Sequence, residues 1–280
     1  KEFETKHPNG IVVFAKILNI DAQKGDISIR LEFAPDGDLI KEDGTLNKTL
    51  KLDTESANGK TEVTFEKGKR MNASEVVLNM YGIETSKGVF SKVEDYPFDK
   101  HNADLYVYIY TKPEKKKEAA KDAAPKEAAD AEKKEGEAEV NEETEVEIPL
   151  LLVFEPSMSG YSITSEKAKD NEDTYVHQVL KISRSSTVVG FASFIMLLMW
   201  GVTLAVVGLV LTVVIGGRKS ELAMFSFIAT LIFSFITLRN AMPGTPPVGT
   251  YSDNLSFFWV EGILGVCLLA VVLTWVFRKS

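Results

Sequence analysis

The stretch TVVGFASFIMLLMWGVTLAVVGLVLTVVIG, residues 187–216, contains no charged side chain over thirty positions. A helix needs only about 20 apolar residues to cross the core of a bilayer. Two further apolar runs follow at 222–238 and 255–277, and the last of them carries one acid, Glu261. The pattern predicts three transmembrane helices, at about 187–216, 222–238 and 255–277, within a membrane domain that occupies residues 185–280.

The remaining residues have a very different composition. The chain of 280 residues has 26% charged side chains and a net charge of −8, and nearly all of the charge lies before Arg184. An acidic balance argues against a nucleic-acid partner. The single cysteine, Cys267, lies in the third apolar run, so a disulfide within the chain is excluded.

Basic residues near the membrane ends give the expected orientation, because cytoplasmic loops are enriched in Lys and Arg. We expect the N-terminal domain to be extracellular or lumenal and the C-terminus to be cytoplasmic. Glycosylation triplets at Asn47, Asn72 and Asn254 fit a lumenal domain. The chain starts at Lys1 without an apolar segment, so we expect either that a signal or anchor has been removed or that the first span directs export. The four basic residues assigned to the inner side are Arg218, Lys219, Arg278 and Lys279, against Lys181, Arg184 and Arg239 on the outer side.

Short runs of alternating polarity fill the N-terminal domain, residues 1–184. The clearest is DISIRLEF at 26–33, which has an almost strict period of two. Seven or eight such strands without helical periodicity predict an antiparallel β-sandwich. The fold class is therefore an all-β extracytoplasmic sandwich followed by an α-helical membrane domain. The runs are 11–18, 26–33, 61–66, 74–79, 105–110, 146–154 and 175–182.

A low-complexity charged insert at 112–147 interrupts this domain. It holds 8 lysines and 13 acids, and Val140 is its only apolar residue larger than alanine before Val146. Such a segment buries too little surface to offset the entropy of ordering it. We interpret it as a solvated insertion between two strands, with a partner-binding tail as the alternative.

Signatures of enzymes are scarce, so we expect a non-enzymatic protein without a cofactor or a metal ion. The three histidines form no His-Glu-x-x-His motif, and neither a phosphate-binding glycine loop nor a Gly-x-Ser-x-Gly motif is present. The acidic turns at 36–38 and 42–44 lack the ligand spacing of an EF-hand. They are more typical of ordinary turns than of a calcium site.

The loop formed by Tyr96, Pro97, Phe98 and Asp99 is the first candidate site. An aromatic residue before proline favours a cis bond, and flanking aromatic residues can reach the membrane interface. Arg184 is the last charge before the first span, and Asp99 is its natural partner if the loop lies at the base of the sandwich. Such a pair would couple the sandwich to the helices. The alternatives are an ordinary apolar turn and an arginine that only anchors the interface.

Hydroxyl side chains line one face of the second span. Ser226, Thr230, Ser234 and Thr237 are spaced by four, four and three residues, which places them on the same side of a helix. This stripe is a candidate pore face in a ring of subunits. It is also typical of small residues that let helices pack closely.

Glu261 is an intramembrane acid, a residue type that is costly in lipid and usually paired or functional. We expect Arg239 or Arg184 to pair with it. A proton or ion site is the alternative interpretation.

Two resemblances follow from these residues. Arg184-Ser185 before the run 194–200, the loop at 240–249, and 257–259 with Glu261 resemble an uncharacterised membrane-protein family, domain of unknown function 4436. This resemblance implies no known activity.

The layout is also similar to a subunit of the pentameric ligand-gated ion channels. The aromatic-Pro-Phe-Asp loop at 96–99, Arg184, the hydroxyl face with Glu221 near its inner end, and the Pro-x-Thr-Pro loop at 243–246 match that family in order. The chain departs from the family in lacking a fourth span, a paired cysteine and a recognisable aromatic agonist site. The resemblance implies a homo-oligomeric, channel-like assembly in the lipid bilayer. The alternative is a membrane-anchored binding or scaffold subunit without a pore.

Overall fold

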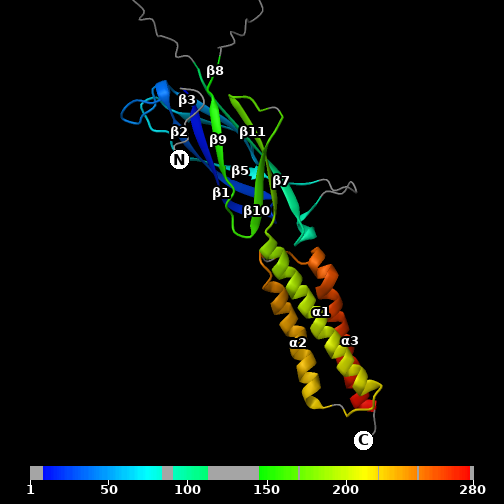
Figure 1. Cartoon of the computed structure of the whole chain (residues 1–280). Helices are drawn as coiled ribbons and strands as arrows, with labels where there is room; N and C mark the ends of the chain where they lie inside the picture. The colour runs from blue at the N-terminus through cyan, green and yellow to red at the C-terminus, as the bar shows by residue number, and fades with distance from the viewer. Residues whose placement is uncertain are drawn as a thin grey trace, which may run out of the picture.

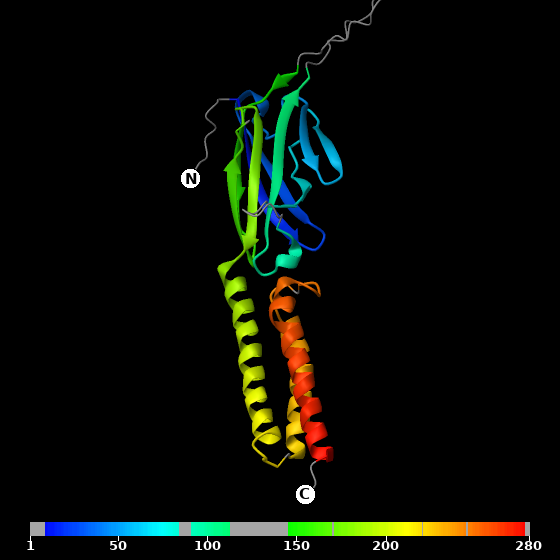
Figure 2. The ribbon, with the colours of Figure 1, turned by 90° about the vertical axis from the view of Figure 1, so that its right-hand side faces the viewer.

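A two-sheet sandwich stands on three helices in the computed structural model, which describes residues 9–83, 91–112, 145–169, 171–219, 221–244 and 246–277 (Figure 1). The sandwich occupies one end of the elongated molecule and the helices the other (Figure 2). The predicted fold class is therefore confirmed. Most of the charged insert, residues 113–144, lies outside the described residues.

The first sheet has the strand order β5-β2-β1-β9. Its pairings are antiparallel except that β1 and β9 run parallel, with Ile11 opposite Leu150. This departs from the predicted all-antiparallel sandwich, because β9 enters beside β1 only after the long connection that contains the insert. The strands are β1 (Ile11–Asp21), β2 (Asp26–Pro35), β5 (Ser74–Asn79) and β9 (Leu150–Glu155).

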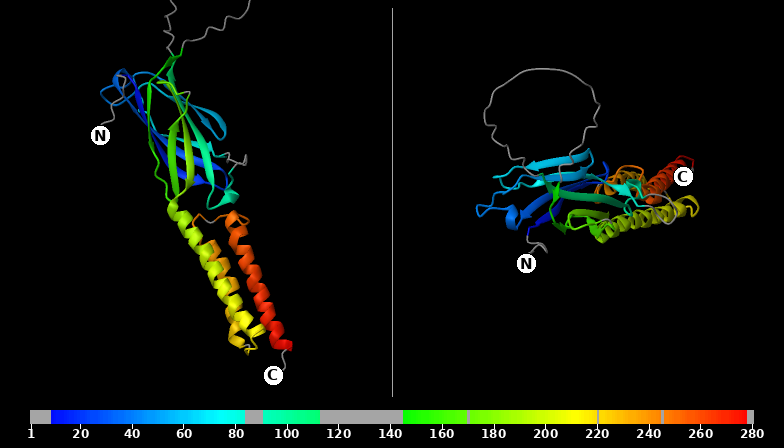
Figure 3. Two further views of the ribbon diagram at one scale, coloured as in Figure 1. Left: turned by 45° about the vertical axis from the view of Figure 1, so that its right-hand side comes forward. Right: turned by 90° about the horizontal axis from the view of Figure 1, so that it is seen from above.

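The second sheet has the order β10-β11-β7-β3-β4, and the short strands β6 and β8 also pair with β7. The periodicity predicts seven or eight strands, and β3, β6 and β10 lie outside the predicted runs. Acidic and hydroxyl residues interrupt the apolar alternation of β3 and β10, and β6 has only two residues. The two sheets are seen from two further sides in Figure 3. The strands are β3 (Leu50–Ser56), β4 (Gly59–Phe65), β6 (Tyr81–Gly82), β7 (Lys100–Thr111), β8 (Val146–Glu147), β10 (Tyr161–Lys167) and β11 (Tyr175–Arg184).

Alternate residues of each sheet form the core of the sandwich. On β1 the buried members include Ile11, Val13 and Ala15, and on β7 they include Leu105 and Val107, all 0% exposed. Each fully buried large aliphatic side chain contributes about 1.5–3 kcal/mol through the hydrophobic effect. The two-residue periodicity in the sequence thus corresponds to apolar side chains on the inner face of each sheet.

The three helices are long and apolar enough to cross a membrane. A single π-helical turn at Asp253–Phe257 (η3) precedes the last helix. The helices lie side by side below the sandwich in both side views (Figures 1 and 2). They are α1 (Ser186–Val214), α2 (Leu222–Asn240) and α3 (Phe258–Phe277), within two residues of the predicted bounds except at the start of the third.

Candidate functional site: the junction between sandwich and helices

Strand β11 continues into helix α1 without a loop. Arg184 is the last residue of the strand, and Ser185 caps the helix by accepting a hydrogen bond from the backbone N–H of Val188 at 3.3 Å. Serine is favoured at this position because its hydroxyl satisfies one of the free N–H groups of the first turn. The sandwich is therefore joined covalently to the first span with only one residue between them.

Arg184 and Asp99 form the buried ion pair that the sequence predicted. The Nε–H group of Arg184 donates to both carboxylate oxygens of Asp99 at 3.1 Å, and the two side chains are 7% and 1% exposed. The guanidinium carbon also lies over two rings, 5.2 Å from the centroid of Tyr96 and 4.7 Å from that of Tyr161. Because buried charges are costly without a partner, these contacts fix the position of Arg184.

Sequence reasoning missed His101, which is a second partner of Asp99. Its Nε2 lies 3.3 Å from Oδ2 of Asp99, and the histidine is 6% exposed. Burial alone would raise the pKa of Asp99, but the hydrogen bonds from His101 and Arg184 outweigh it and hold that pKa below its ordinary value of 3.8. The alternation of β7 could have indicated this residue, because it falls on the same face as the core residues Ala103 and Leu105.

Tyr96 connects this cluster to the loop between α2 and α3. Its hydroxyl donates to the carbonyl oxygen of Pro243 at 2.8 Å, and its own carbonyl accepts from the N–H of Ser252 at 3.2 Å. The ring is 0% exposed and packs in the apolar cluster of the helices, and burial raises its pKa to about 12. The bond between Tyr96 and Pro97 is cis, as the sequence favoured.

Two neighbouring residues complete the contact. Phe98 is 48% exposed, and its ring meets that of Tyr251 edge-on at 6.3 Å. Gly244 has a φ of +79°, and a Cβ atom there would lie 3.0 Å from Nη1 of Arg184. Glycine at this position therefore allows the backbone to approach the arginine closely, because a residue with a side chain would be strained at this φ and would crowd the guanidinium.

Arg239 has a different partner from the one expected. It donates to both carboxylate oxygens of Asp253, at 2.9 and 2.8 Å, and the two side chains are 5% and 0% exposed. A further bond to the carbonyl oxygen of Pro247 measures 2.7 Å, and Asp253 accepts from the N–H of Gly249 at 2.8 Å. The pair closes the α2–α3 loop on itself.

The expected pairing of Glu261 is therefore wrong, because both arginines bond to other acids. Within the described part of the chain, its buried Oε1 atom has no hydrogen-bond partner. The proton-or-ion interpretation of this residue stays a prediction.

The hydroxyl stripe of α2 points away from the other helices. Ser226, Thr230, Ser234 and Thr237 are all exposed, whereas Ile228 and Phe235 on the opposite face are buried. Thr230 donates to the carbonyl oxygen of Ser226 at 2.7 Å and Ser234 to that of Thr230 at 2.8 Å. Glu221, the candidate at the inner end, is the exposed N-cap residue of α2.

The acidic turns behave as turn residues in the structure. Asp36 accepts from the N–H of Gly37 at 2.7 Å, and Asp43 accepts from the N–H and the hydroxyl of Thr45 at 2.9 and 2.6 Å. Their carboxylates are used locally, which is the ordinary role of aspartate in a turn.

The fold and the junction define a multi-pass membrane protein whose β-sandwich is seated directly on its spanning helices. Two family models match the chain and meet at this junction: a domain of unknown function (DUF4436) over residues 1–181, and a second domain of unknown function (DUF8686) over 184–278. The chain belongs to the DUF4436 family, whose model covers more than half of it. The membrane residues that carried the resemblance lie in the second match. Among curated proteins, none matches the chain.

Proposed function

We propose that this protein is a non-enzymatic subunit of a homo-oligomeric, channel-like assembly in the lipid bilayer. The sandwich lies outside the cytoplasm, extracellular or lumenal, and the C-terminus is cytoplasmic. The observation that carries the proposal is the outward hydroxyl face of α2, formed by Ser226, Thr230, Ser234 and Thr237.

The four hydroxyl residues lie exposed on one face of α2. If several copies associate with this face inward, the hydroxyls line a shared axis, where water replaces lipid. Glu221 then stands at the cytoplasmic mouth and places a ring of carboxylates there. Rings of acidic side chains favour cations, so the expected permeant species is a cation.

The junction supports coupling between the sandwich and this face. Displacement of the sandwich base acts on α1 through Arg184 and on the loop after α2 through Tyr96, which bonds to Pro243 and is bonded by Ser252. The outer end of α2 is in turn tied to the start of α3 by Arg239 and Asp253. A ligand or partner on the sandwich could thus shift the pore-facing helix.

A membrane-anchored binding or scaffold subunit is the second candidate. It is favoured by the hydrogen bonds from Thr230 and Ser234 back to carbonyl oxygens of their own helix. Hydroxyls satisfied in this way also tolerate lipid or a packed neighbouring helix. In that case the outward face joins protein surfaces and conducts nothing.

Oligomer mass and conductance separate the two candidates. The purified chain is weighed in detergent by light scattering and then reconstituted into planar bilayers, with Thr230→Trp as the test variant and Ile236→Trp, at another exposed position of α2, as its control. Reduced conductance in Thr230→Trp alone supports the pore. A monomer, or equal conductance in both variants, contradicts it.

Orientation is tested separately with single cysteines. Cys267 is buried, so new cysteines at Ser157 in the sandwich and Lys219 in the α1–α2 connection report without a large background. A membrane-impermeant maleimide applied to intact cells should label position 157 and leave position 219 unlabelled if the sandwich is extracellular. If it is lumenal, the reagent applied to sealed microsomes, whose outer face is the cytoplasmic one, should label position 219 and leave position 157 unlabelled. The reverse pattern contradicts the assignment.

A further inference from the structure

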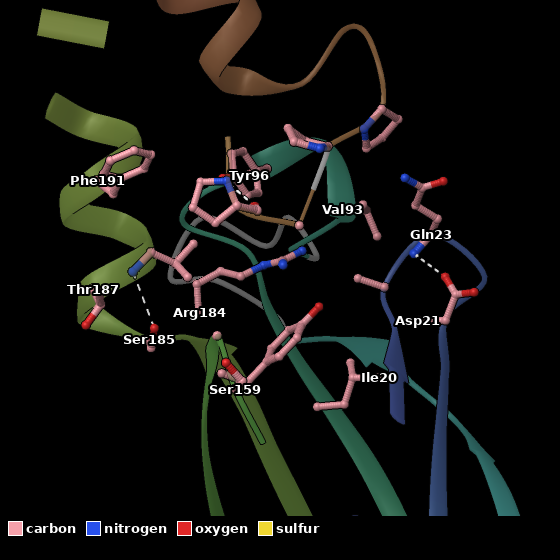
Figure 4. A pocket seen from close by; sticks show the side chains of 18 of the residues that line it. Ile20, Asp21, Gln23, Val93, Tyr96, Ser159, Arg184, Ser185, Thr187 and Phe191 are labelled. Atoms are coloured by element: carbon pink, nitrogen blue, oxygen red, sulfur yellow. Dashed lines mark hydrogen bonds between the residues drawn. The ribbon is translucent and has the colours of Figure 1, made fainter. Parts of the chain in front are cut away.

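A cavity of about 740 Å³ lies at the junction, beside the first turn of α1 (Figure 4). Five segments line it: the β1–β2 turn around Asp21, the segment before β7 at Val93 and Tyr96, the start of β10 at Tyr161, the residues that open α1, and the α2–α3 loop at Gly244. Its size lies within the range of about 300–1,000 Å³ that is usual for sites of small molecules. Arg184 projects into it from the end of β11 (Figure 4).

The guanidinium of Arg184 has donors to spare. A guanidinium carries about five N–H donors, and here only the Nε–H group is used, by Asp99. The terminal nitrogens have no hydrogen-bond partner among the described residues. The contacts with Asp99 and with the rings of Tyr96 and Tyr161 restrain the guanidinium, and its Nη1 atom lies beside Gly244, which also lines the cavity. Such a fixed fork suits the oxygens of a phosphate group.

Other groups around the cavity also favour an anion. Tyr161 lines it, and its hydroxyl has no hydrogen-bond partner in the described part of the chain. Burial raises the pKa of Tyr161, which keeps that hydroxyl protonated as a donor. Helix α1 begins at this wall, and the start of a helix attracts negative charge.

The acid that shares the cavity is already compensated. The carboxylate of Asp21 accepts the backbone N–H groups of Gln23 and Lys24 at 3.1 Å and lies 3.5 Å from the ammonium of Lys24. Asp99 is shared between Arg184 and His101. Neither carboxylate therefore presents an uncompensated charge to an incoming anion.

The position of the cavity near the membrane surface favours a lipid as its ligand. Helix α1 has 29 residues, which at about 1.5 Å each extend about 43 Å. The hydrocarbon core is about 30 Å thick, so roughly 13 Å of α1 extends beyond it. Because Arg184 and the polar base of the sandwich stand directly before α1, we place the first turn of the helix at the level of the headgroups. Phe191, which is 47% exposed, lines the same cavity one turn below Thr187 and offers an apolar wall.

We propose that this cavity binds the phosphate of a phospholipid headgroup, with the free edge of Arg184 and the hydroxyl of Tyr161 as donors and with the glycerol end of the lipid against Phe191. The proposal is independent of a pore. It gives Arg184 a second role, since the same guanidinium holds the sandwich through Asp99 and the lipid through its terminal nitrogens.

Native mass spectrometry of the detergent-solubilised full chain tests the proposal. Dioleoylphosphatidylcholine is titrated, and dioleoylglycerol, which has the same acyl chains without a phosphate, is its comparison. We expect one saturable phospholipid per chain and at least tenfold weaker binding of dioleoylglycerol. Equal binding of the two lipids overturns the proposal, because the phosphate would then contribute nothing.

Variants locate the site. Arg184→Gln should weaken phospholipid binding at least tenfold. That change can also disturb folding, so a second variant, Ser159→Trp, fills the cavity while Arg184 and Asp99 are both kept. Ser157→Trp, two residues away and not lining the cavity, is its matched control. Loss of binding in Ser159→Trp with retention in Ser157→Trp supports the assignment, and retention in both refutes it.

Inorganic phosphate distinguishes the two sources of the ligand. At millimolar concentration it should compete only weakly with the phospholipid, because it lacks the part that lies against Phe191. Competition at concentrations equal to those of the lipid would overturn the lipid assignment and leave a site for free phosphate.

Discussion

Removal of either partner of the Arg184–Asp99 pair should destabilise the sandwich strongly and non-additively. Breaking a buried ion pair from one side costs roughly 3–5 kcal/mol, since the remaining charge is left buried. The loss of stability in Asp99→Ala should lie at the upper end of this range, because Arg184 then keeps only its aromatic neighbours. The loss in Arg184→Ala should lie at the lower end, because Asp99 keeps its contact with His101 at 3.3 Å.

The double variant should lose little more free energy of unfolding than one single variant, because neither charge of the pair is then left buried without its partner. This gives a coupling energy of about 2–3 kcal/mol, within the range of contacting residues. Urea titration of the detergent-solubilised chain, followed by the circular dichroism of the sheets, measures it. Arg30 and Glu32 form an exposed control pair at 3.0 Å, for which about 0–1 kcal/mol is expected. Additivity within about 0.5 kcal/mol at Arg184 and Asp99 would refute the reasoning.

Three further predictions use the same assay. Gly244→Ala and Gly249→Ala both place alanine at positive φ, which costs roughly 1–2 kcal/mol of stability. Only Gly244→Ala also adds a Cβ atom 3.0 Å from a guanidinium nitrogen, so it should be the more destabilising of the two. Equal losses of stability would contradict this. Tyr96→Phe removes one hydrogen bond to the α2–α3 loop and should cost about 0.5–1.5 kcal/mol, whereas no measurable loss would argue against that bond. The lowered pKa of Asp99 stabilises the fold above pH 3.8, and this contribution is lost as the pH falls through the lower folded value, so Asp99→Asn should flatten the acid limb of the stability curve; an unchanged limb would count against the pair.

The spans and most strands were predictable because their signals are local. β5 was found with both its ends, and α2 was found within two residues. Strand β10 was missed because Ile163 is its only buried apolar residue, which leaves too little alternation to detect.

The junction was predictable in part. The ion pair of Arg184 and Asp99 followed from one isolated cation and one loop acid near the membrane. The partner of Arg239 did not follow, because Glu261 is an acid inside a predicted span and was therefore the expected partner of a nearby arginine. The turn at 246–252 instead brings Asp253 to Arg239, and the lone acid is left without either arginine.

The sequence by itself determined which segments favour hydrocarbon and which form strands with one buried face. Both properties depend on residues that are neighbours in the chain: the first is the sum of the transfer free energies of consecutive side chains, and the second is the alternation of apolar and polar side chains. Only the tertiary structure decided which polar groups are in contact, namely Asp99 with His101 and Arg239 with Asp253. It also decided that the guanidinium of Arg184 lies at a cavity. A hydrogen bond depends on distance and direction between residues far apart in the chain, and spacing along the sequence does not carry that information.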